Sequence, residues 1–131
     1  MSDNVRHFRT PLARVRGRGA ARSGTGHFWR QRLTAVANIP LTIAAIIIII
    51  TLLGRNQAAA AQILGSPLVA IIMLLFIISV TVHMRIGMQV IIEDYVHGEG
   101  MKLALIALNT FFTIAVGVAS IFALLKLAFG G

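Results

Sequence analysis

The fold class of this chain is decided by residues 66–95, SPLVAIIMLLFIISVTVHMRIGMQVIIEDY. The apolar part exceeds the roughly 20 residues that a helix needs to cross a bilayer. Ser66 and Pro67 suit an N-cap and a first helical position, which is typical of a helix start. The stretch therefore predicts a membrane-spanning helix over about 67–92. Ionisable side chains inside such a helix are costly and usually functional, so His83 is the first candidate site residue.

Two further apolar stretches flank this helix. The first, over about 33–53, contains five consecutive isoleucines. Isoleucine runs also occur in strands, but the whole stretch has the length of a spanning helix. Pro40 lies inside it and should loosen or kink the helix, because proline lacks the backbone donor. The third stretch covers about 102–128, after a break at Gly98 and Gly100.

The chain is therefore expected to be an all-α integral membrane protein with three transmembrane helices, forming one domain over 33–129. Its 131 residues are 57% hydrophobic and 12% charged, whereas a soluble domain carries about 25% charged residues. The excess apolar surface must face lipid or other subunits. The absence of cysteine excludes disulfides, thiolate metal sites and cysteine catalysis.

Most of the net charge of +8 lies ahead of the first span. We interpret residues 1–32 as a basic arm, flexible over 1–26, followed by a polar-aromatic entry with Phe28 and Trp29 at the membrane interface. The positive-inside rule then predicts a cytoplasmic N-terminus. The arm contains these basic residues: Arg6, Arg9, Arg14, Arg16, Arg18, Arg22, Arg30 and Arg32.

The arm has other interpretations. It is rich in arginine and poor in acids, as mitochondrial transit peptides are. With the alanines at 58–61 as a cleavage site it also resembles a secretory signal, but the apolar run over 33–53 exceeds the ~7–15 residues of a signal core. It lacks the interleaved aromatic residues typical of nucleic-acid binding, so no nucleic acid is expected.

One face of the second helix carries the candidate chemistry. At about 100° per residue, Ser79, His83, Gly87 and Asp94 lie close to one line. Small residues one turn away on each side of His83 leave room for a flat macrocycle, and histidine is a common axial ligand of haem. The alternatives are that His83 bonds a neighbouring helix and that the small residues permit close packing. Met84 is more typical of packing than of ligation.

The end of the helix carries an Asp94-Tyr95 pair. A tyrosine hydroxyl there can donate to a quinone carbonyl oxygen, and the carboxylate beside it can pass protons from the aqueous side. The alternative is an interfacial tyrosine anchor beside ordinary acidic residues. Arg32, at the same membrane side, could contribute to an anion or quinone pocket. Arg85 lies deep and needs an anionic partner or an extended path to the interface.

The segment His83-x-x-x-Gly87-Met88-x-x-x-x-x-Asp94-Tyr95 resembles the second helix of the small hydrophobic membrane anchor of succinate dehydrogenase, complex II. The step Arg32-Leu33-Thr34-Ala35, three short spans and the basic arm are consistent with the alphaproteobacterial and mitochondrial-like branch. As sequence, the resemblance covers about fifteen residues.

This resemblance implies roles for four residues. His83 would be one axial ligand of haem b, with the second ligand on the partner anchor, the cytochrome b subunit. Tyr95 would bind ubiquinone with Asp94 beside it, and Arg32 would lie near the quinone or the haem propionates. The partners would be the cytochrome b anchor, the iron–sulfur subunit and the flavoprotein, in a bacterial inner membrane or, alternatively, a mitochondrial inner membrane.

The chain alone should not be an enzyme, because it has no flavin-binding glycine motif and no iron–sulfur cysteines. We expect a non-catalytic anchor. One alternative is a haem-free anchor. The other is a small transporter or channel subunit with a proton path through His83, Arg85 and Asp94. The quinone type, the haem potential and the oligomeric state are open at this point.

Overall fold

The computed structural model describes residues 22–130, with side chains from Thr25 onward. The expected basic arm lies largely outside these residues. The described chain forms four helices in the order α2 (Arg22–Leu52), α3 (Gln57–Leu64), α4 (Pro67–Tyr95) and α5 (Glu99–Ala128).

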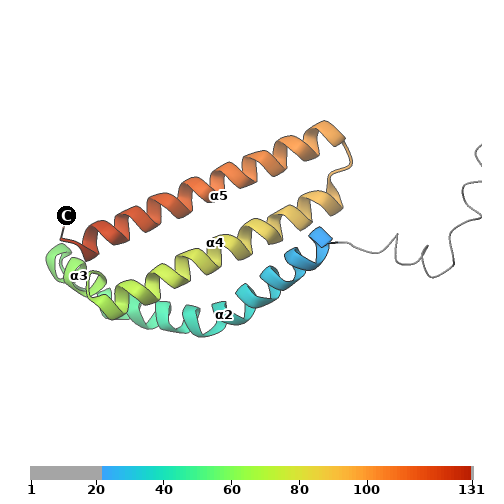
Figure 1. Ribbon diagram of the computed structural model, residues 1–131. Coiled ribbons are helices and arrows are strands. Elements are labelled where there is room, and N and C mark those ends of the chain that lie inside the picture. The colour runs from blue at the N-terminus through green and yellow to red at the C-terminus, as the bar shows by residue number, and fades with distance from the viewer. Residues whose placement is uncertain (1–21, 131) are drawn as a thin grey trace, which may run out of the picture.

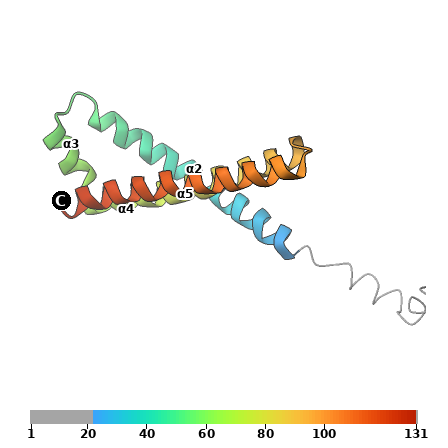
Figure 2. The same cartoon turned by 90° about the horizontal axis from the view of Figure 1, so that it is seen from above.

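The three long helices lie in a row with α4 in the middle. Helix α4 packs against both α2 and α5. Figure 1 shows α4 and α5 running side by side, and Figure 2 shows α2 crossing them obliquely. The start of α2 and the end of α4 therefore lie at the same end of the molecule, while α3 lies at the other end.

The lengths of these helices confirm the predicted fold class. Helices α2, α4 and α5 are each long and apolar enough to cross a membrane. The 29 residues of α4 span about 43 Å at 1.5 Å per residue. This exceeds a hydrocarbon layer of about 30 Å, so the ends of α4 reach the polar interfaces.

Helix α2 begins earlier than the apolar pattern indicates, at Arg22 rather than near Leu33. Its first turns are polar and aromatic, so hydropathy alone places the start too late. The helix continues through Pro40 and is visibly curved in Figure 1. It is followed by Gly54 with φ of 72°, a left-handed conformation that glycine adopts without strain.

The short helix α3 lies between the first two predicted spans, outside every predicted helix. Asn56 begins it, because its side-chain oxygen accepts a hydrogen bond from the Ala59 amide at 2.8 Å. This N-cap satisfies one of the free amides of the first turn. The alanine run that could be interpreted as a cleavage site instead continues this helix, since alanine has the highest helix propensity.

The described residues bury little of their own apolar surface. The buried apolar side chains are Ala45, Ile48, Ile86, Ile92 and Leu124. Many large apolar side chains along all three long helices are exposed, including Ile47, Leu75 and Phe111. A chain of this kind cannot be soluble, and its surfaces require lipid or other membrane subunits.

A hydrogen bond and a close approach at a glycine hold α5 against α4. The Asn109 side-chain amide donates to the Arg85 carbonyl at 3.1 Å, which joins α5 to α4. A Cβ built on Gly117 would lie 3.1 Å from Thr81 Cγ2, so α5 approaches α4 closely there. Small residues permit this close approach in membrane helices.

Gly65→Ala should destabilise the chain. Its new Cβ would lie 2.7 Å from the Leu127 carbonyl oxygen and 3.0 Å from the Ala61 oxygen. Backbone atoms cannot move aside cheaply, so we expect a loss of about 1–3 kcal/mol, measured as a lower thermal midpoint of the purified complex. Gly100→Ala is the control, because nothing lies within 4 Å of its added Cβ. Equal midpoints for the two variants would contradict the close packing of α3 on α5.

Candidate functional site

The central candidate, His83, contacts helix α2. Its Nδ1 lies 3.1 Å from Thr34 Oγ1, within hydrogen-bond distance. His83 is sixteen residues from Pro67 and twelve from Tyr95, or about 24 Å and 18 Å along the helix. His83 therefore lies near the middle of a membrane-spanning helix. Its side chain is half-buried.

The hydroxyl that meets His83 is itself held in place. Thr34 Oγ1 donates within its own helix to the Arg30 carbonyl at 2.7 Å, with the Gln31 carbonyl at 3.1 Å. One turn before His83, the Ser79 hydroxyl donates to the Thr34 backbone carbonyl at 3.4 Å. The side chain and the backbone carbonyl of Thr34 thus both contact the face of α4 that carries His83.

The small residues that flank His83 lie in the contact between α4 and α2. A Cβ built on Gly87 would lie 3.5 Å from Gln31 Nε2, and Ser79 bonds the Thr34 carbonyl. Helix α2 thus contacts both positions, and room for a macrocycle beside His83 stays a prediction. Close helix packing, the alternative interpretation, describes them.

The far side of the imidazole is different. Among the described residues, His83 Nε2 has no hydrogen-bond partner. No three histidine, aspartate or glutamate side chains in this part of the chain are grouped so that they could hold a metal. The described residues therefore do not supply a full set of such ligands for a metal at His83.

A depression of about 290 Å³ lies between the first turns of α2 and the last turns of α4. Arg32 lines it, and the Arg32 guanidinium carbon lies 5.0 Å from the centre of the Phe28 ring, a cation–π contact. Gln31 lines it too, and Gln31 Oε1 is buried without a hydrogen-bond partner. Buried polar atoms are nearly always paired, so this oxygen indicates a missing donor. The full lining is His27, Phe28, Gln31, Arg32, Ile86 and Val90.

Asp94 and Tyr95 lie at the last two positions of α4. Both side chains are exposed, Tyr95 by 78%, and neither is paired within the described residues. They share an end of the molecule with the first turns of α2 (Figure 1). Asp94 thus lies at the same end of the molecule as the depression. It follows Val90 by one turn, so it is on the face of α4 that lines the depression.

Arg85 lies on the other side of α4 and is exposed. Among the described side chains, none forms an ion pair with it. A guanidinium at this depth is costly unless it is paired or reaches the interface. This side of α4 therefore requires a partner that the chain does not itself supply.

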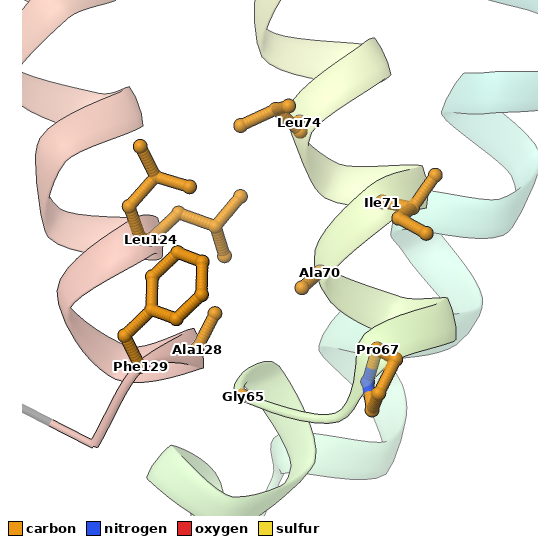
Figure 3. Close-up of a pocket in the computed structure, with 9 residues that line it drawn as sticks. Gly65, Pro67, Ala70, Ile71, Leu74, Leu124, Ala128 and Phe129 are labelled. Atoms are coloured by element: carbon orange, nitrogen blue, oxygen red, sulfur yellow. The ribbon is translucent and has the colours of Figure 1, made fainter.

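A second cavity, of about 250 Å³, lies at the opposite end beside α3. Figure 3 shows Leu74 of α4, Leu124 of α5 and Phe129, which follows α5, around it. Its lining is apolar and contains no ionisable side chain, so we assign no chemistry to it. The complete lining is Gly65, Pro67, Ala70, Ile71, Leu74, Leu124, Leu125, Ala128 and Phe129.

Two polar residues of the α2 face that contains Thr34 were missed in the sequence. Thr34 stood out only as part of a motif, and Asn38 did not stand out, although its Oδ1 is buried without a partner. With Gln31 they follow i, i+3, i+7 spacing and lie on one face of α2. Polar residues recurring at helical spacing inside an apolar span are the signal that could have found them.

Fold and site together define a helical integral membrane subunit whose candidate functional groups need other chains for completion. The family model described as succinate dehydrogenase/fumarate reductase transmembrane subunit matches residues 6–123. The succinate dehydrogenase hydrophobic membrane anchor subunit of Paracoccus denitrificans is 34% identical over 121 residues, which cover 92% of this chain and 93% of the relative. That of Rickettsia bellii is 32% identical over 118 residues, covering 88% and 93%.

The chain belongs to the family of succinate dehydrogenase and fumarate reductase transmembrane subunits. It is a multi-pass, non-catalytic membrane anchor subunit of succinate dehydrogenase, as the resemblance implied. A transporter or channel subunit, the second alternative, is not supported. The membrane anchor subunit of Reclinomonas americana is also similar, at 33% identity over 66% of this chain and 75% of the relative. No solved structure matches the chain.

The contact between α2 and α4 predicts a size limit at Gly87. In Gly87→Ala the new Cβ would meet Gln31 Nε2 at 3.5 Å, an ordinary contact, so the variant should be tolerated. In Gly87→Leu the longer side chain must displace Gln31 or α2, at a cost of about 1–3 kcal/mol. The thermal midpoint of the purified complex measures both. A leucine variant as stable as the alanine variant would contradict this packing.

Proposed function

We propose that this anchor subunit supplies His83 as one axial ligand of a haem b shared with a second anchor subunit, and contributes Tyr95 and Asp94 to a ubiquinone site. One observation carries the haem part of the proposal. A histidine near the middle of a spanning helix has Nδ1 engaged by Thr34 and its other ring nitrogen without a partner among the described residues. That is the arrangement of a metal-ligating histidine.

The residues present fit a haem in their chemistry. A neutral imidazole nitrogen suits iron, and haem is commonly held by histidine. The chain offers one such ligand within its spans, so a second must come from another subunit. When bound, haem b supplies one-electron transfer within the membrane. His83 would hold the iron through its free ring nitrogen.

The proposed quinone site uses the end of α4. The exposed Tyr95 hydroxyl is free to donate to a quinone carbonyl oxygen, which fixes the headgroup at the membrane surface. Asp94, beside it and near the aqueous phase, can accept and release protons for that headgroup. Arg32, which lines the depression at the same end, is proposed to lie near the quinone or a haem propionate.

The proposed partners follow from the unpaired groups. The second anchor, the cytochrome b subunit, would cover exposed membrane-depth surface such as that at Arg85. The iron–sulfur and flavoprotein subunits would dock at the Tyr95 end, because electrons must reach the quinone there. We propose that this end faces the cytoplasm at a bacterial inner membrane, because the positive-inside rule favours the cytoplasmic side for the basic residues at the start of the chain. The mitochondrial matrix side is the corresponding alternative.

His83→Ala should remove the b-type signal from the reduced-minus-oxidised spectrum of the purified complex, because the iron loses an axial ligand. Met84→Leu is the matched control, since Met84 is the neighbouring residue and is exposed. It should leave the spectrum unchanged. An intact b-type signal in His83→Ala would remove His83 as the ligand and favour the haem-free interpretation of this residue.

Tyr95→Phe should lower kcat/KM for ubiquinone about 3- to 10-fold, the value of one lost hydrogen bond. Succinate oxidation with an artificial acceptor that takes electrons from the soluble subunits should be unchanged, which controls for assembly. Normal quinone kinetics in the variant would argue against a direct contact of the tyrosine hydroxyl.

A further inference from the structure

We infer that Thr34 is a positioning residue for the haem ligand: its hydroxyl accepts the Nδ1 proton of His83 and so fixes the tautomer and ring orientation that leave Nε2 for iron. This rests on the proposed ligand role of His83. The juxtaposition that carries it is Thr34 Oγ1 at 3.1 Å from His83 Nδ1, across two helices.

The hydroxyl proton decides the direction of this hydrogen bond. Thr34 has one proton to donate, and the Arg30 carbonyl lies 2.7 Å from its oxygen with the Gln31 carbonyl at 3.1 Å. A hydroxyl that donates to these carbonyls meets His83 with its lone pairs. The proton between the two residues must therefore come from the imidazole, as Nδ1–H. In a neutral imidazole this leaves Nε2 unprotonated and able to bind a metal.

The position of the hydroxyl is also fixed from α4. The Ser79 hydroxyl donates to the Thr34 carbonyl at 3.4 Å, and the neighbouring turn of α2 lies against Gly87. Contacts one turn before and one turn after His83 thus hold this part of α2 against α4. They prevent the threonine from moving away from the ring.

An accepted Nδ1 hydrogen bond has a measurable effect on the ligand. It makes the imidazole a better electron donor, which favours the oxidised iron. Loss of such a partner typically lowers metal affinity about 10- to 100-fold. Removing the hydroxyl should therefore raise the haem midpoint potential and weaken haem retention, while the complex still assembles.

The test uses the intact complex with Thr34→Val, which removes the hydroxyl and keeps the side-chain shape. Thr34→Ser restores a hydroxyl and should recover the wild-type potential and haem retention. Thr113→Val is the matched control: Thr113 makes the same bonds to its own helix, at 2.8 Å to Asn109 and 3.1 Å to Thr110, without a histidine partner. The readouts are the haem potential by redox titration, the low-spin haem EPR signal and the haem content per complex.

The outcomes separate this inference from the proposed function. A higher potential, a shifted EPR signal and an about 10- to 100-fold weaker haem retention in Thr34→Val, with serine and the Thr113 control normal, support it. Unchanged haem properties in Thr34→Val overturn it, while loss of haem in His83→Ala would still uphold the ligand role. Thr34→Ala is measured as well. If neither the valine nor the alanine variant assembles, Thr34 has a general packing role and the inference is overturned. A retained b-type signal in His83→Ala overturns the proposed function itself.

Discussion

The packing of α2 across one face of α4 is the constraint on which the site depends. Within lipid there is no hydrophobic force between helices, so they associate through close packing and interhelical hydrogen bonds. Ser79 and Gly87 allow the approach, and Thr34 meets His83 between them. Hydrogen bonds between membrane helices contribute only about 0.6 kcal/mol on average. The contact at His83 is therefore more significant for the orientation of the imidazole than for the stability of the fold.

The same row of helices explains why the chain depends on lipid or other subunits. Because α4 contacts α2 and α5 in a row, most apolar side chains of the described residues remain exposed. Arg85 at membrane depth, the open end at Tyr95 and the unpaired oxygen of Gln31 all lack partners within the described chain. Each of these is a place where lipid, a cofactor or another subunit completes the structure.

Much of the fold was predictable because spanning helices are encoded locally. Apolar length identified three spans, and Ser66-Pro67 placed the start of α4. The start of α2 and helix α3 were missed, since polar or alanine-rich turns carry no hydropathy signal. His83, Asp94 and Tyr95 were selected from spacing and resemblance, and their roles stay predictions. The contact of Thr34 with His83 joins residues 49 positions apart and depends on how two helices cross, which no local pattern encodes.

The most direct measurement is an experimental structure of the whole membrane complex at a resolution that defines the side chains around His83. The account predicts a haem iron bonded to His83 Nε2, a second axial ligand from another subunit and Nδ1 facing Thr34 Oγ1. A haem whose two axial ligands both come from other chains, or a His83 ring turned so that Nε2 faces Thr34, would contradict it.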